Sequence, residues 1–297
     1  MNYAKRERET LGFIPYSGRG SVEETFYPWD LTVERFKKDG LSESIADNAL
    51  YFTSLHTNSF DELKNLYFTT NGSYGVKNYE QDMNFDPLIR LSFHLPFARK
   101  CPKIIEDNSV DKESGIRKVL RYPIESYEDW ECLKSYGNQQ LENFYTDQII
   151  KETYNPFIID HKQGLYSLRL NIEGFFWVPR ELLGIENHLF SFYDDPELIH
   201  DICQTMLQIY STELIKVVDL LKPDVLYIQE DLSGKNGPMI SADFFNEFIG
   251  HYYRKLIPLL KEHGVGCVLV DTDGDFNTLI PHFIDSGVEG FLPMDVN

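Results

Sequence analysis

The second half of the chain alternates short apolar segments with longer amphipathic ones, and each of the apolar segments ends in a carboxylate. The segments read YSLRLNIE, DVLYIQED, VGCVLVDTD and VEGFLPMD; their terminal acids are Glu173, Glu230 and Asp231, Asp271 and Asp273, and Asp295. Strands and helices that alternate in this order predict a parallel sheet with right-handed crossovers. The carboxyl ends of parallel strands meet at one edge, where α/β folds bind their ligands. The pattern therefore predicts acids gathered around a ligand site.

The same reasoning predicts the boundaries of the individual elements. Strands are predicted at 10–16, 87–94, 166–173, 225–230, 266–271 and 289–294. One helix is predicted to begin at Asp195 and Pro196, as N-cap and first-turn proline, and another runs from Ser241 to Gly264. A shorter helix near 276–285 is predicted to end at Gly287.

The spacing of these units predicts a barrel. The repeat averages about 40 residues, which is typical of a (β/α)₈ TIM-type barrel with elaborated loops. The polar, aromatic stretches 41–85 and 100–165 are interpreted as helices and loops laid over it. Because six strands are predicted and a closed barrel has eight, residues 1–297 are expected to form one barrel domain with N-terminal helical elaborations, lacking the last two βα units.

Composition narrows the class of partner. The chain carries 28 Lys and Arg against 47 Asp and Glu, a net charge of −19, which disfavours nucleic acid and anionic membranes. No apolar run is long enough to span a bilayer, and the N-terminus MNYAKRERETLGF lacks a secretory core, so a cytoplasmic location is expected. The four cysteines form no CxxC pair, which argues against a disulfide framework and a thiolate zinc cluster.

The loop EDLSGKNGPMIS, residues 230–241, is the most specific stretch. Glu230 and Asp231 at a strand end are candidates for a general base, a metal ligand or a partner for a cation. Lys235 is a candidate for substrate binding, or it neutralises an acid within a structural loop.

The segment VLVDTDGD, residues 268–275, places two acids one residue apart. If the strand continues, Asp271 and Asp273 point to the same side. With Glu230 they would offer oxygen ligands, which suit Mg, Ca or Mn better than zinc. The alternative is that Asp273 or Asp275 caps the next helix.

The segment GFFWVPRELLGIEN, residues 174–187, follows Glu173, itself a candidate for substrate binding. Its aromatic residues are Phe175, Phe176 and Trp177. Aromatic loops at a barrel mouth form apolar walls for ligands, and Arg180 could hold a carboxylate. Alternatively the segment is a lid in which Arg180 pairs with Glu181 or Glu186.

Two further candidates lie in the first half. Arg19 lies in the glycine-containing stretch YSGRGSVEETFYPW, residues 16–29. Asp86, in NFDPLI, precedes a predicted strand and would cap it or reach the barrel mouth.

Residues 166–297 resemble the uroporphyrinogen decarboxylase superfamily. The resemblance rests on GFFWVPRELLG, YDDPELIHDI, PDVLYIQEDLSGKNGPMIS, GVGCVLVDTDGD and GVEGFLPMD, with weaker support from ETFYPW and YPIESYEDWECLK. It implies a (β/α)₈ barrel with its site at the C-terminal rim. The decarboxylases of this superfamily form homodimers, so the resemblance also implies a homodimer. The superfamily includes cofactor-free decarboxylation of uroporphyrinogen and zinc-assisted methyl transfer between a corrinoid carrier and a small thiol.

The chain departs from both patterns. Only Arg19 stands where the decarboxylase has an arginine-rich motif, and Asp86 is the candidate for its catalytic aspartate. The acids at the rim would repel an octa-anionic porphyrinogen. In the methyltransferases a His-x-Cys zinc motif occupies the position of Asp271 and Asp273, which argues against a thiolate zinc site here and leaves an oxygen-rich metal site as an alternative.

Three hypotheses follow. The first is methyl transfer or demethylation of a small, cationic or methylated substrate with a corrinoid protein as partner, in which Glu230 and Asp231 bind a divalent metal or the cationic group. The second is decarboxylation of uroporphyrinogen, a tetrapyrrole, without a cofactor, with Arg19 and Arg180 holding carboxylates. The third is an inactive, truncated barrel.

The candidate catalytic residues are Glu230, Asp231, Asp271 and Asp86. The candidate substrate-binding residues are Arg19, Glu173, Phe175, Phe176, Trp177, Arg180 and Lys235. The candidate metal ligands are Asp271, Asp273 and Glu230.

Overall fold

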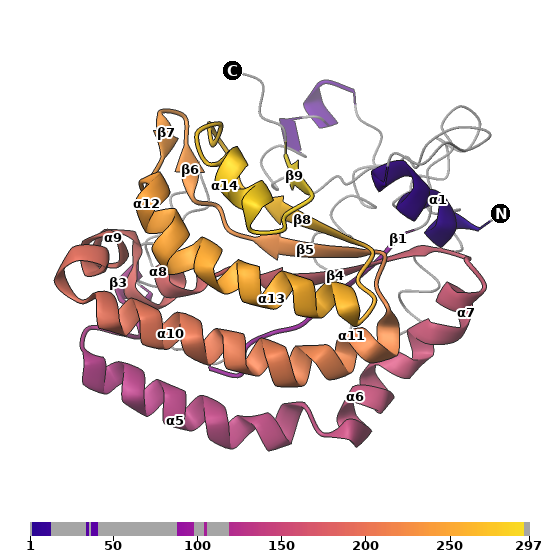
Figure 1. Cartoon of the computed structure of the whole chain (residues 1–297), viewed down its shortest axis with the longest axis horizontal. Coiled ribbons are helices and arrows are strands. Elements are labelled where there is room, and N and C mark those ends of the chain that lie inside the picture. The colour runs from indigo at the N-terminus through magenta and orange to yellow at the C-terminus, as the bar shows by residue number, and fades with distance from the viewer. Residues whose placement is uncertain are drawn as a thin grey trace. The chain divides into compact units, whose positions relative to one another are not determined.

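A computed structural model describes residues 2–12, 34–35, 37–40, 88–97, 104–105 and 119–293 (Figure 1). The predictions for Arg19, Asp86 and Asp295 lie outside these residues. The chain divides into two compact units, Met1–Arg90 with Pro156–Arg169, and Leu91–Asn155 with Leu170–Asn297. The side-chain contacts of the candidate site discussed below lie within the second unit.

Five of the described strands form one parallel sheet, which together with the helices makes an α/β fold (Figure 1). The strand order is β1 (Leu88–Ser92), β4 (Ser167–Glu173), β5 (Val225–Gln229), β8 (Cys267–Asp271) and β9 (Gly290–Leu292). Five of the six predicted strands are confirmed. Closure of the sheet into an eight-stranded barrel stays a prediction.

The sixth predicted strand, 10–16, is wrong where the structure describes it. Thr10 and Leu11 belong to helix α1 (Tyr3–Leu11), whose N-cap Asn2 accepts a hydrogen bond from the backbone N–H of Lys5 at 2.8 Å. The side-chain cap and the polar run after it favour a helix over the short apolar segment that suggested a strand.

The three helices predicted after β4 are present, whereas the segment 174–187, predicted as a loop, contains one further helix and the start of another. Asp195 caps α10 (Pro196–Ile209), and a π-helical turn continues it into α11 (Ile215–Leu221). Ser241 caps α12 (Ala242–Phe245), which continues through another π-helical turn into α13 (His251–Glu262), and Gly264 follows with φ 99°. The predicted short helix is α14 (Ile280–Asp285).

The sequence did not resolve the remaining elements individually. They are β2 (Ile104–Ile105), β3 (Val119–Arg121), α5 (Tyr127–Phe144), α6 (Asp147–Tyr154), α7 (Ile158–Lys162), α8 (Trp177–Leu183), α9 (Ile185–Asp194), β6 (Ser233–Gly234) and β7 (Gly237–Pro238). No helix among the described residues combines the length and apolar character needed to cross a bilayer.

The two faces of the sheet differ in burial. Leu226 and Ile228 of β5, like Val268 and Val270 of β8, are fully buried. Glu230, the next residue on this face of the β5 segment, contacts Tyr253 of α13, so the apolar face lies under the helices. On the other face, Tyr227 and Gln229 of β5 and Leu269 and Asp271 of β8 are only half-buried. A parallel strand covered on both faces is usually apolar throughout, so the half-buried face is the one available to a ligand.

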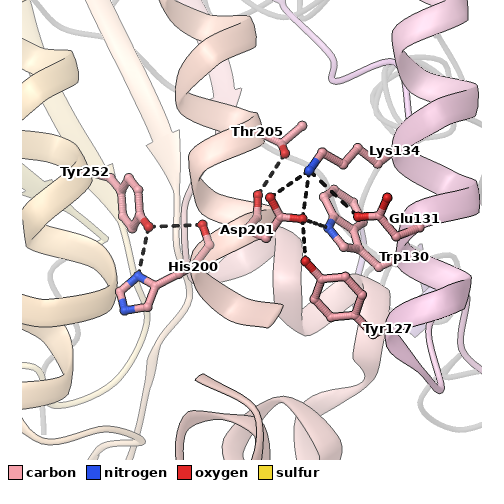
Figure 2. Close-up of polar contacts among 8 residues, drawn as sticks. All are labelled: Tyr127, Trp130, Glu131, Lys134, His200, Asp201, Thr205 and Tyr252. Carbon is pink, nitrogen blue, oxygen red and sulfur yellow. Dashed lines mark hydrogen bonds and ion pairs between the residues drawn. The ribbon is translucent and has the colours of Figure 1, made fainter. Parts of the chain in front are cut away.

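A polar cluster joins α5 to α10 outside the sheet (Figure 2). Asp201 of α10 accepts hydrogen bonds from Trp130 Nε1 at 2.7 Å, Lys134 Nζ at 2.7 Å and Tyr127 Oη at 3.2 Å. On the other side of α10, the Tyr252 hydroxyl of α13 donates to the carbonyl of His200 at 3.1 Å. These contacts fix α10 between its two neighbouring helices.

Candidate functional site

The carboxyl ends of β5 and β8 lie side by side, as the sequence predicted from the acids at the ends of these strands. The parallel register pairs Gln229 with Asp271, and Asp271 with Leu292 of β9. The backbone N–H groups of Glu230 and Asp231 both donate to the carbonyl of Asp271, at 2.9 and 3.1 Å. The acids that follow these strands therefore lie at one edge of the sheet.

The carboxylate of Glu230 is buried inside the turn that starts α8. It accepts hydrogen bonds from the backbone N–H groups of Phe175, Phe176 and Trp177 at 3.0, 2.8 and 3.0 Å, and from the hydroxyl of Tyr253. Three successive N–H groups at the start of a helix form a binding site for an anion. Glu230 thus supplies from β5 the cap that α8 lacks in its own sequence.

Two opposing effects act on the ionisation of Glu230. Burial raises its pKa and the hydrogen bonds from Tyr253, Phe176, Trp177 and Phe175 lower it; burial has the larger effect, so the pKa is raised to about 7. The donors occupy the carboxylate and favour its charged form. These contacts support an anchoring role, and the catalytic and metal-binding roles predicted for Glu230 stay predictions.

Asp231 and Arg180 form an ion pair at the rim. Arg180 Nη1 donates to Asp231 Oδ2 at 3.0 Å and to its carbonyl at 2.7 Å, and the guanidinium lies 5.1 Å from the ring centre of Trp177. Asp231 adopts φ 47°, a conformation that is uncommon outside glycine. Arg180 is thus paired with Asp231, in place of the alternative partners Glu181 and Glu186, and it fastens α8 to the loop after β5.

The aromatic residues predicted to wall the site separate into two groups. Phe175 is 1% exposed and packs on Tyr210 and Tyr253, and Phe176 is 0% exposed and contacts His188. The structure places both rings in the core, where a ligand at the rim would not reach them. Trp177 is half-buried and remains available at the rim.

A row of polar side chains lies on the half-buried face near this edge. It consists of Asn171, Glu173, Tyr227, Gln229 and Asp271, all at alternating positions of their strands. The Tyr227 hydroxyl donates to the carboxylate of Asp271. Asn171 Oδ1 and Glu173 Oε2 are buried and have no hydrogen-bond partner among the residues that the structure describes. Buried acceptors without donors are rare in folded proteins, so this row is the candidate ligand-binding surface.

Glu173 has the ionisation expected of an acid–base group. Its pKa is raised to about 7, mainly by burial; a hydrogen bond from the Leu95 backbone lowers it and the neighbouring Glu181 raises it. A carboxyl group that exchanges its proton near neutral pH is suited to general acid–base catalysis. The sequence predicted Glu173 for substrate binding only.

The loops after β5 and β8 interlock beside this row. Asp275 N–H donates to the carbonyl of Gly234 at 3.0 Å, and Leu232 N–H donates to Thr272 Oγ1 at 3.1 Å. Gly274 has φ 74°, and a Cβ there would lie 2.6 Å from the Gly234 backbone, so glycine is required. The predicted substrate ligand Lys235 and the predicted metal ligand Asp273 are both exposed on these loops.

The metal predictions have no supporting cluster in the described part of the chain. No group of three or more His, Cys, Asp or Glu side chains there has the arrangement of a metal site. Metal binding by Asp271, Asp273 and Glu230 stays a prediction. Asp275, predicted as an alternative helix cap, instead accepts from the backbone of Asn277 at 3.1 Å ahead of α14.

Several residues of this site were missed from the sequence. They are Asn171, Tyr227, Gln229 and Tyr253. The signal for the first three was present, because polar residues at every second position within otherwise apolar strands mark one face as polar. Tyr253 lies within a helical pattern, where only the folded structure brings it to Glu230.

Comparison with known proteins gives a fold relationship. The sequence matches no family model and no curated protein. Among solved structures, a methyltransferase from Methanosarcina mazei is similar, with a TM-score of 0.55 and 13% sequence identity; the match covers 97% of this chain and 74% of that chain. At this identity the likeness shows a shared fold, and the resemblance to the uroporphyrinogen decarboxylase superfamily stays a prediction.

Proposed function

We propose that the protein is an enzyme that transfers a methyl group to or from a small substrate at the carboxyl edge of its parallel sheet. The observation that carries the proposal is the likeness to an archaeal methyltransferase over 97% of the chain. The polar row from Asn171 to Asp271 supports it, because it lies at the edge where α/β folds bind ligands. Closure into a barrel belongs to the same proposal.

Different residues of the row would carry out different steps of such a reaction. When a methyl group moves to an acceptor that carries a proton, the acceptor must lose that proton as the new bond forms. Glu173, with its pKa raised to about 7 by burial, is placed to take it. The Tyr227 hydroxyl holds the carboxylate of Asp271 in position at the same edge.

The surrounding loop residues would position these groups. Arg180 and Asp231 fasten the start of α8 to the β5 loop, which keeps Trp177 at the rim. Lys235 is exposed on the neighbouring loop and is proposed to contact the substrate or the partner that delivers it.

The described residues do not fit a thiolate zinc site. Cys203 and Cys267 are buried and Cys132 is exposed on α5, whereas the strand end at Asp271 offers carboxylates. The proton transfer above is carried by side chains alone, and a divalent metal held by Asp271, Asp273 and Glu230 stays a prediction. A corrinoid protein is the proposed partner, as the source or acceptor of the methyl group.

A single-turnover assay tests this function. The protein would be mixed with a methylated corrinoid protein and candidate thiol or amine acceptors, and loss of the methyl–cobalt absorbance would be followed. Glu173→Gln, which keeps the size of the side chain, is expected to slow the transfer by about 10²-fold or more. Glu186→Gln removes the same charge from the exposed surface of α9 and should have no effect.

Parallel incubation with uroporphyrinogen separates the two enzyme hypotheses. Decarboxylated porphyrinogens, formed without any methyl transfer, would overturn the proposal in favour of the decarboxylase. Transfer that proceeds equally well in Glu173→Gln would remove Glu173 from the mechanism.

A further inference from the structure

Two buried oxygen atoms at neighbouring positions of one strand face have no hydrogen-bond donor among the residues that the structure describes. They are Asn171 Oδ1 and Glu173 Oε2, both at the carboxyl end of β4. We propose that together they bind a protonated primary or secondary amine, whose N–H groups donate to both oxygens. The inference rests on the proposed function, since the amine would be the group that gains or loses the methyl.

The spacing suits a single ammonium group. Residues two apart on a strand lie on the same face, with Cα atoms about 6.6 Å apart. An ammonium nitrogen between the two side chains can lie about 2.8 Å from each oxygen. Both residues are half-buried, so part of each side chain reaches the surface although these oxygens are covered.

The ligand must donate hydrogen bonds. Leaving a buried acceptor unpaired costs about 1–3 kcal/mol per group. In this row, Asn171 Oδ1 and Glu173 Oε2 are the two such acceptors among the described residues. A primary ammonium has three N–H groups and a secondary ammonium has two, so either satisfies both oxygens. A quaternary ammonium has none, although its charge is the same.

The ligand must also be cationic. Within the described part of the chain, the effects that set the pKa of Glu173 are its burial, the Leu95 N–H and Glu181, with no Lys or Arg among them. A buried carboxylate without a cationic partner is unfavourable when ionised. A cation bound at Oε2 would supply the missing charge, whereas an amide or alcohol would supply only hydrogen bonds.

Ligand-observed NMR titrations with simple probes test the proposal. The probes are methylammonium and dimethylammonium chloride, with tetramethylammonium chloride lacking N–H groups and acetamide lacking charge, all at constant ionic strength and pH 8. We expect saturable binding of the first two, and binding of the last two that is weaker by about tenfold or more.

Two variants locate the site, with one matched control. Glu173→Gln should weaken methylammonium binding by about tenfold or more, and Asn171→Leu, which removes the acceptor at similar size, by about five- to tenfold. Glu186→Gln, an equal loss of charge on the exposed surface of α9, should leave it unchanged. Thermal unfolding of each variant shows that it is folded.

Three results would overturn the inference. They are tetramethylammonium binding as tightly as methylammonium, acetamide binding as tightly as methylammonium, and methylammonium binding that survives Glu173→Gln. Because these titrations need no corrinoid partner, a failure of amine binding can be told apart from a failure of methyl transfer. Amine binding without methyl transfer would leave the site standing and reject the reaction.

Discussion

Gly174 lies directly against the carboxylate of Glu230. A Cβ atom at position 174 would be 2.2 Å from Cδ of Glu230, which is closer than real Cβ atoms approach their neighbours. The carboxylate has no room to retreat, because three backbone N–H groups and Tyr253 hold it. The first residue after β4 is therefore glycine because the acid after β5 occupies the space of its side chain.

Replacing this glycine tests the relationship. Gly174→Ala is expected to lower the free energy of unfolding by about 2–4 kcal/mol, since the added methyl group must displace a buried, fully bonded carboxylate. Gly234→Ala is the matched control, because a Cβ there meets nothing within 4 Å. Denaturant titration measures both; equal losses in the two variants would contradict the close contact.

The hydrogen bonds to Glu230 are tested by changing the acceptor. In Glu230→Gln one carboxylate oxygen becomes an NH₂ group that faces N–H donors, so at least one donor loses its partner. We expect a loss of about 2–3 kcal/mol in the free energy of unfolding. A variant as stable as the parent protein in denaturant would show that the carboxylate does not anchor the start of α8.

The cluster around Asp201 is expected to stabilise the packing of α5 on α10 (Figure 2). Asp201→Asn removes the charge that pairs with Lys134 Nζ at 2.7 Å, and should lower the free energy of unfolding by about 1–3 kcal/mol. Asp219→Asn is a control with a similar pair, to Lys222 Nζ at 2.7 Å, in an exposed place. There the loss should stay below about 1 kcal/mol.

Acid should weaken the same cluster. Although burial raises the pKa of Asp201, the hydrogen bonds from Lys134, Trp130 and Tyr127 lower it overall. A lowered pKa in the folded state means stability that is present above the unfolded pKa of about 3.9 and is lost as the pH falls through the folded value. The difference in stability between Asp201→Asn and the parent protein should therefore shrink below about pH 4.

The burial of His188 leads us to expect a second effect of pH on the free energy of unfolding, with a different cause. Both of its ring nitrogens are buried without hydrogen-bond partners in the described structure, and burial, followed by the charge of Arg180, lowers its pKa to about 3. The unfolded chain takes up the proton at pH values below about 6.5 while the folded chain does not. Stability attributable to His188 is therefore lost as the pH falls from about 6.5 toward 3.

A comparison of variants isolates this contribution. Glu173 and Glu230, whose pKa values are raised to about 7, act in the opposite direction, so the measured quantity is the difference between His188→Leu and the parent protein. We expect His188→Leu to gain relative stability by up to about 1.4 kcal/mol per pH unit between pH 6.5 and 4.5. A constant difference over that range would show that His188 protonates in the folded protein.

Much of the fold was predictable from the sequence because its signals are local. Asp195 and Ser241 were recognised as helix caps, and each accepts the backbone hydrogen bond that a cap must accept. The strands ending at Glu173 and Asp271 were recognised because apolar runs of that length, bounded by turn residues, have few alternatives. The strand prediction was wrong at Thr10 and Leu11, where the short apolar run favours a strand less than the preceding capped segment favours a helix.

The roles within the candidate site depended on contacts between distant segments. The sequence placed Glu230 at the edge of the sheet and treated it as a reactive acid, but its partners, Phe175 and Tyr253, lie 55 and 23 residues away along the chain. Likewise Arg180 pairs with Asp231, 51 residues away, and not with the nearby Glu181 or Glu186. Periodicity and caps report what one segment prefers by itself. Glu230 is buried and bonded, whereas Glu173 keeps one oxygen without a donor among the described residues. This difference depends on packing between segments that only the tertiary structure brings together.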